Sequence, residues 1–182
     1  MAMESKDPYA RGGSDEVIDY AMALGRAMNL QGSDLDALHV AALLHDIGMS
    51  AAGDVVTLGN RPLSTVEWGM LKMHPVIAAE ILEQAPALRA AIPIVYHHHE
   101  HYDGGGYVGG IAGDGIPLGA RILAVADAYV AMISDRSYRA GKTHDEALAE
   151  LLGESGSQFD PHVVKAFAEV LAGGEVGNAR SD

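Results

Sequence analysis

The sequence predicts an all-α protein, a single bundle of about seven helices around one core. Apolar residues recur at helical spacing through most of the chain, whereas the two-residue alternation of a strand is scarce. Two capping boxes, at 64–67 and 143–146, mark the starts of helices. A length of 182 residues suits one domain, and no stretch resembles a linker. We therefore expect one domain over residues 14–173, with tails at 1–13 and 174–182.

Periodic apolar residues, caps and stops place the expected helices in chain order. The helices are expected at residues 15–30, 34–47, 64–73, 75–86, 88–99 and 118–134, with two more that open at Thr143 and Asp160. Ser33 is the expected cap of the second helix and Gly48 its stop. Pro93 lies inside the fifth helix and predicts a kink there.

One long irregular stretch, from Asp103 to Pro117, contains seven glycines. A loop of this length inside a compact domain is usually either functional or disordered. The helical bundle is therefore expected to include one glycine-rich loop.

Composition and charge exclude several classes of protein. The formal net charge of −13 argues against a non-specific nucleic-acid binder, which needs a basic face, although an arginine pair could still hold a small phosphate ligand. No apolar run approaches the roughly 18 residues of a membrane span, and the first residues lack a secretory signal. We expect a cytoplasmic protein with neither a nucleic-acid polymer nor a membrane as partner. Because cysteine is absent, any metal must be held by imidazole and carboxylate.

Four places along the chain offer metal ligands. His45-Asp46 ends an apolar helix, where a buried carboxylate needs a cation or several donors. His74 precedes a proline, the histidine cluster at 97–101 borders the glycine-rich loop, and Asp127 lies in an apolar helix. Taken singly, each place also has a structural explanation without a metal. His45-Asp46 can be a hydrogen-bonded structural pair and His74 a half-exposed histidine. The cluster at 97–101 can be a solvated histidine run, and Asp127 a buried acid paired with another group.

In their order along the chain these motifs resemble the HD-GYP family. The motifs are His45-Asp46-Ile47-Gly48, His74-Pro75, His98-His99-Glu100-x-x-Asp103-Gly104-x-Gly106-Tyr107, Ile116-Pro117-x-x-Ala120-Arg121-Ile122-Leu123-x-Val125-x-Asp127, Ser134-Asp135-Arg136-x-Tyr138-Arg139 and Phe159-Asp160-Pro161. The resemblance extends over about residues 7–172. It implies an HD-domain helical bundle and a bacterial signalling enzyme.

The resemblance also implies a metal-dependent phosphodiesterase that hydrolyses cyclic di-GMP to the linear dinucleotide, to GMP, or to both. Carried over by motif, one metal is held by His45, Asp46 and Asp127. Asp46 bridges to a second metal, which is held also by His74, His98 and His99. His45 and Asp46 are the expected catalytic residues. Such nitrogen and oxygen ligands suit iron or manganese, and two ions about 3.5–4 Å apart can neutralise the charge that develops on a phosphodiester.

Three further residues are expected to bind the substrate. In the family, the position of Tyr107 contacts the ligand, and those of Arg136 and Arg139 bind its phosphate. The two arginines are three residues apart on or after one helix, so both can face one phosphate. Beside cyclic di-GMP, the partners implied are a receiver, sensor or GGDEF-type domain protein and a second copy of the chain.

Four positions depart from the family pattern. Gly13 stands where the family has a metal-binding histidine, which weakens the first metal site, and Met49 replaces a phosphate-binding lysine. Val108 replaces the proline of Gly-Tyr-Pro, and Val130 replaces an aspartate. The alternatives are therefore a catalytically degenerate domain that acts as a nucleotide sensor or protein-interaction module, and an HD phosphohydrolase with another substrate.

Overall fold

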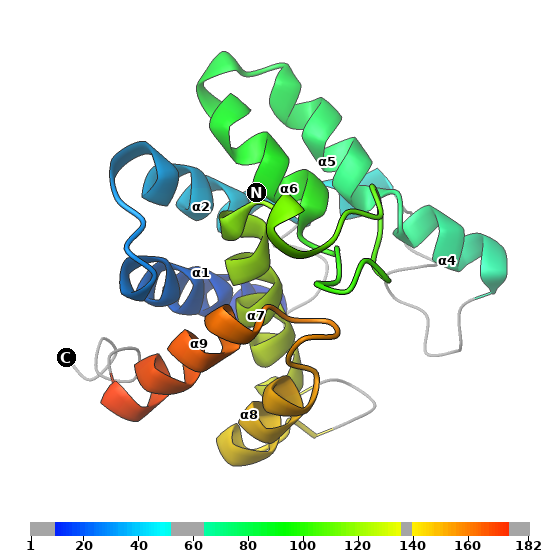
Figure 1. The fold of residues 1–182 in the computed structure, drawn as a ribbon. Coiled ribbons are helices and arrows are strands. Elements are labelled where there is room, and N and C mark those ends of the chain that lie inside the picture. The colour runs from blue at the N-terminus through cyan, green and yellow to red at the C-terminus, as the bar shows by residue number, and fades with distance from the viewer. Residues whose placement is uncertain (1–9, 52–63, 136–139, 175–182) are drawn as a thin grey trace.

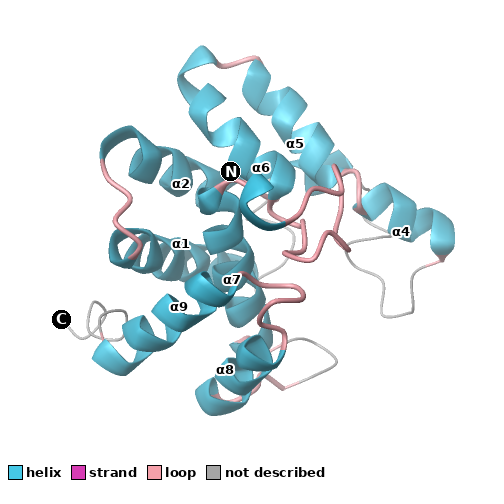
Figure 2. Cartoon of the chain, in the orientation of Figure 1, coloured by secondary structure: helices cyan, strands magenta, loops and turns pink. Residues whose placement is uncertain are grey.

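The computed structural model describes residues 10–51, 64–135 and 140–174, and these residues form helices joined by loops (Figure 2). The helices are α1 (Ala10–Ala27), α2 (Gly32–Leu44), η1 (Ile47–Ala51), α4 (Thr65–Leu71), α5 (His74–Glu83), η2 (Pro86–Ala91), α6 (Ile92–His97), η3 (Gly113–Gly115), α7 (Leu118–Ile133), α8 (His144–Gly153) and α9 (Pro161–Gly173), where η marks a 3-10 helix. One isolated bridge, Ser155 to Phe159, is the only strand-like pairing in these ranges. The predicted all-α fold is confirmed.

Helix α7 runs through the middle of the bundle (Figure 1). It packs against α1, α2, α6, α8 and α9, and its side chains are buried around most of its circumference. A helix buried in this way is apolar on nearly every face, which is why residues 122–130 contain a single charge, at Asp127. None of the described helices is both long and apolar enough to cross a bilayer.

The predicted helix caps are present at four ends. Ser64 and Thr143 each accept a hydrogen bond from the backbone N–H three residues on, and the glutamate at that position returns it, so both capping boxes are complete. The Asp160 side chain accepts from the His162 backbone N–H and starts α9. Gly174 ends α9 with a φ of 68°, a conformation that glycine adopts without strain.

Several boundaries at the start of the chain differ from the prediction. Helix α1 begins at Ala10 rather than near Ser14. Helix α2 begins at Gly32, with Gln31 as its N-cap and no side-chain capping bond, so Ser33 is not the cap. Helix α2 ends at Leu44, and the 3-10 helix η1 begins at Ile47 and includes Gly48, so Gly48 is not the stop.

The predicted helix over 88–99 is two elements instead of one kinked helix. Residues 86–91 form η2, and α6 starts a new helical turn with Pro93 in its first positions. Proline has no N–H to donate to the preceding turn, but the first turn of a helix needs no such donor. The proline therefore separates the two helices and begins the second.

Gly48 permits a close approach of two backbones, those of η1 and α5. A Cβ added there would collide with the His74 carbonyl oxygen and would lie 2.9 Å from the Ala78 backbone nitrogen. Helix η1 therefore packs directly on the first turn of α5. This contact brings the chain just after His45 and Asp46 against the helix that begins at His74.

We expect the substitution Gly48→Ala to destabilise the fold by about 2 kcal/mol or more, because backbone atoms must move to admit the methyl group. The measurement is the free energy of unfolding from urea titration monitored by circular dichroism. Gly153→Ala, at the end of α8, is the control because an added Cβ meets no atom within 4 Å there. Equal stability of the two variants would contradict the close approach.

Candidate metal centre

The four places predicted to offer metal ligands come together in space. His45 and Asp46 follow α2, His74 begins α5, His98 and His99 follow α6, and Asp127 lies in α7. Asp46 links both sides: its Oδ2 lies 3.4 Å from His45 Nε2, and its Oδ1 lies 3.5 Å from His74 Nε2. Asp127 Oδ1 lies 3.8 Å from His45 Nε2. Residues up to 82 positions apart in the sequence therefore form one cluster.

Three of the buried histidines are oriented by the same local interaction. In each of them, Nδ1 lies within hydrogen-bond distance of the carbonyl oxygen three residues earlier. The pairs are His45 with Ala42 at 2.9 Å, His74 with Leu71 at 2.7 Å, and His98 with Val95 at 2.7 Å. These carbonyls are in the last turns of α2, α4 and α6, where no residue further along the helix satisfies them. A carbonyl only accepts, so Nδ1 must bear the proton.

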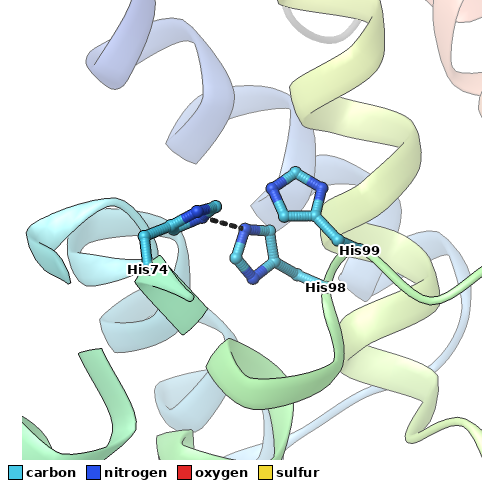
Figure 3. A group of neighbouring side chains, drawn as sticks. All are labelled: His74, His98 and His99. Atoms are coloured by element: carbon cyan, nitrogen blue, oxygen red, sulfur yellow. Dashed lines mark hydrogen bonds between the residues drawn. The ribbon is translucent and has the colours of Figure 1, made fainter. Parts of the chain in front are cut away.

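Two ring nitrogens consequently face each other in the middle of the cluster. His74 Nε2 and His98 Nε2 are 3.4 Å apart, as the dashed line in Figure 3 shows. Burial, followed by the neighbouring His99, holds the pKa of His98 well below its ordinary value, so this ring is neutral. Its Nε2 lone pair points at His74, and a proton or a metal ion between the two nitrogens is required to offset their repulsion.

His99 completes a set of three nitrogen ligands. Its ring lies beside those of His74 and His98 (Figure 3), and one nitrogen from each of the three falls within 4.8 Å of the other two. Burial and then the neighbouring His74 lower the pKa of His99 to about 3. Since neutral imidazole is the form that ligates metals, these side chains fit a divalent cation.

The opposite side of the cluster has the reverse electrostatics. Burial opposes a charge on His45, but Asp46 and Asp127 outweigh it and raise the pKa of His45. The two carboxylates thus favour a positive charge at His45 Nε2, which a proton or a metal ion can supply. Asp46 is half exposed, so the cluster opens to solvent at the residue that joins its two sides.

Tyr107 lies beside the cluster, on the glycine-rich loop. Its ring stacks on His99 with centroids 4.9 Å apart, and its backbone N–H donates to the His99 carbonyl oxygen at 3.1 Å. Burial and then the charges of Asp46 and Asp127 raise the pKa of Tyr107, so the phenol keeps its proton. A neutral hydroxyl can donate a hydrogen bond to an anion bound in the cluster.

Glu100 fixes the loop that contains Tyr107, a role that sequence analysis did not assign. Its buried carboxylate accepts from the Gly109 backbone N–H at 2.6 Å and from that of Gly110 at 3.0 Å, and His97 Nδ1 lies 3.4 Å away. In the sequence, the feature that could have indicated this role is the position of Glu100 between histidines and just before a run of glycines. Such an acid can accept from backbone N–H groups that the glycine loop leaves without partners.

The remaining residues named from the sequence are the two predicted phosphate-binding arginines and the positions that depart from the family pattern. Arg136 and Arg139 lie outside the described residues. Val130 is buried in α7, where it packs in the core, and Met49 is half buried in η1. Lys72 was not among the residues predicted for the site. Its Nζ lies 5.3 Å from the centre of the Tyr107 ring.

Comparison with known proteins gives one family match and several close relatives. The family described as HD domain matches residues 1–163. The cyclic di-GMP phosphodiesterase response regulator RpfG of Xanthomonas campestris pv. campestris is 36% identical over 168 residues, which are 91% of this chain and 44% of the relative. The 3'3'-cGAMP-specific phosphodiesterase 3 of Vibrio cholerae is 31% identical over 93% of this chain and 37% of the relative. The chain thus spans less than half the length of these relatives.

A solved structure supports the same architecture. Bd1817, an HDG"Y"P protein from Bdellovibrio bacteriovorus, superposes with a TM-score of 0.71 and 20% sequence identity, over 88% of this chain and 51% of its own. At this identity the likeness concerns the fold alone.

We expect the substitution Glu100→Gln to lower the free energy of unfolding by about 1–3 kcal/mol, because the amide nitrogen cannot accept from a backbone N–H. Hydrogen exchange should quicken at Gly109 and Gly110, whose donors lose a charged acceptor. Urea unfolding and exchange mass spectrometry measure the two effects. Glu83→Gln, at an exposed position in α5, is the matched control. If hydrogen exchange at Gly109 and Gly110 is as slow in the Glu100→Gln variant as in the parent protein, Glu100 does not fix the loop.

Proposed function

Because the chain belongs to the HD domain family, in its HD-GYP branch, we propose that it is a metal-dependent phosphodiesterase that hydrolyses cyclic di-GMP. The observation that supports this most directly is the convergence of imidazoles and two carboxylates on one space. The relative RpfG is named for the same activity. In the reaction, the oxygen of water forms a bond to phosphorus, one P–O ester bond breaks, and the released sugar oxygen takes a proton. The product is the linear dinucleotide, GMP after a second cleavage of the same kind, or both.

Two divalent ions, iron or manganese, are proposed to bind between these side chains. His45, Asp46 and Asp127 would hold one, and His74, His98 and His99 would hold the other with Asp46 between them. When bound, such ions polarise a phosphoryl oxygen and activate water. The cluster has a carboxylate-rich side and an imidazole-rich side, and this division supports two metal-binding positions with different affinities. The position beside His45 is the weaker one, since Gly13 cannot supply the imidazole expected there.

The protein side chains have defined tasks in this proposal. The hydrogen bonds from Nδ1 to helix-end carbonyls keep each Nε2 lone pair directed into the site, so little reorientation accompanies metal binding. The Tyr107 hydroxyl would donate a hydrogen bond to a phosphate oxygen and would itself stay protonated. Arg136 and Arg139 remain predicted phosphate ligands, and a receiver, sensor or GGDEF-type partner remains predicted as well.

A degenerate domain that binds a cyclic dinucleotide without hydrolysing it is the second candidate. The observation that favours it is the pair of departures at Gly13 and Met49, which removes one expected metal ligand and one expected phosphate-binding cation. The 3'3'-cGAMP-specific relative makes that dinucleotide the alternative substrate to include in every assay.

We expect the purified protein, reconstituted with manganese or with ferrous iron under anaerobic conditions, to convert cyclic di-GMP to the linear dinucleotide. Elemental analysis measures the metal bound per chain, and chromatography of the products measures turnover. Cyclic di-GMP and 3'3'-cGAMP are compared at equal concentration. Bound metal together with nucleotide binding and no product would identify the degenerate domain, and preferential cleavage of 3'3'-cGAMP would change the assigned substrate.

We expect Asp46→Ala to abolish binding of both metals, whereas Asp127→Ala should retain the metal of the imidazole-rich side. The reason is that Asp46 lies against both His45 and His74, while Asp127 lies 3.8 Å from His45, on the carboxylate-rich side. Metal content per chain after reconstitution is the measurement. Asp36→Ala, at an exposed position in α2, is the control and should bind as the parent protein does. Equal metal content in Asp46→Ala and Asp127→Ala would refute the assignment.

A further inference from the structure

We propose that Lys72 is a phosphate-binding residue of this site, positioned by the ring of Tyr107 to contact a phosphodiester oxygen of the substrate. This inference rests on the proposed function. It assigns a role to a residue of the α4–α5 junction, which lies outside the metal-ligating set and outside the arginine pair predicted from the sequence.

The backbone position of Lys72 is fixed by the same turn that orients a candidate metal ligand. Lys72 follows the last residue of α4, and its backbone N–H donates to the Trp68 carbonyl oxygen at 3.0 Å. Two residues later, His74 directs Nδ1 to the Leu71 carbonyl oxygen. Lys72 is therefore two residues before a candidate metal ligand, and the contact of its side chain with Tyr107 shows where its ammonium group lies.

The side chain of Lys72 is directed to the site by an aromatic contact. Its Nζ lies 5.3 Å from the centre of the Tyr107 ring, and the same ring stacks on His99 at 4.9 Å. An ammonium group at this distance from an aromatic centre is attracted by the electron-rich face of the ring. Tyr107 therefore connects the cation to an imidazole of the metal cluster.

Unlike Arg121 and Lys142, Lys72 has no carboxylate partner in the described part of the chain. Arg121 is held by Asp114 and Asp160, and Lys142 is held by Glu150. Lys72 is exposed and makes no ion pair with a described acid. Its three N–H donors are thus available for an anion, which a flexible lysine side chain can follow into position.

The negative charge of the substrate makes a cation at this position favourable for binding. A cyclic dinucleotide has two phosphodiesters, each with one negative charge, and it must approach a protein whose formal net charge is −13 and a site with two carboxylates. Met49, in η1, offers no charge to the site. A lysine at the rim attracts the anion and holds a phosphate through charge-assisted hydrogen bonds, which are stronger than neutral ones.

The test compares Lys72→Met, Lys72→Arg and a control, Lys165→Met, which removes an exposed charge on α9. Steady-state kinetics with cyclic di-GMP give KM and kcat. Titration of the metal-free protein with the linear dinucleotide gives an equilibrium dissociation constant, because the proposed cleavage requires the metals. We expect Lys72→Met to raise both KM and the dissociation constant about tenfold or more, with kcat changed by roughly twofold at most. The dependence of binding on ionic strength should also weaken, because one charge contact is lost.

The other variants separate a charge contact from a structural one. Lys72→Arg should bind within about threefold of the parent protein, since a cation is retained. Metal content and the unfolding midpoint should stay at parental values in all three variants. Lys72→Met that matches Lys165→Met in binding, or that weakens binding only through lost metal or lost stability, overturns the proposal.

Failure of the proposed function is distinguishable from failure of this inference. If the parent protein binds the linear dinucleotide but does not hydrolyse cyclic di-GMP, the phosphodiesterase assignment fails, and the binding comparison still decides the role of Lys72. If the parent protein binds neither nucleotide when loaded with metal, both proposals are refuted.

Discussion

The arrangement of the site depends on one interaction, the hydrogen bond from histidine Nδ1 to a carbonyl at the end of a helix. His45, His74 and His98 each make it, with the carbonyl three residues earlier. The bond satisfies a helix-end carbonyl that has no backbone partner and places the proton on Nδ1. It therefore directs every Nε2 lone pair away from the helix and into a shared interior space. The ends of three helices are in this way converted into three aligned ligands.

The fold contributes the convergence of those helix ends. Gly48 lets η1 touch the backbone of α5, and the apolar α7, with a single acid in its buried stretch, packs against α2 and α6. Glu100 fixes the glycine-rich loop through the Gly109 and Gly110 backbone donors. Tyr107 is thereby held against His99, where it borders the candidate metal centre. The contacts of Gly48 and of α7 join segments that are distant in sequence, whereas the loop contacts join residues eight to ten positions apart. The site therefore requires both the folded domain and the local structure of the loop.

The electrostatics of the cluster are divided between its two sides. Burial and neighbouring rings keep His98 and His99 neutral, whereas Asp46 and Asp127 raise the pKa of His45. A cation is stabilised by lone pairs on one side and by full negative charge on the other. Of the departures from the family pattern, Met49 is half buried in η1. Val130 packs in the core of the bundle.

The sequence by itself determined the helical class, the capping boxes, the family and the identity of the six clustered residues, because periodicity, caps and motifs are properties of local order along the chain. It placed the starts of α1 and α2 wrongly and joined η2 to α6, since helix boundaries depend on packing and on which backbone donors are needed. Only the tertiary structure decided which ring nitrogen each histidine presents and how near Asp46 lies to both sides. It alone assigned Glu100 to the glycine loop and Lys72 to Tyr107. Those relations are distances between segments far apart in sequence or rotamers fixed by their surroundings, and no pattern of residue types encodes them directly.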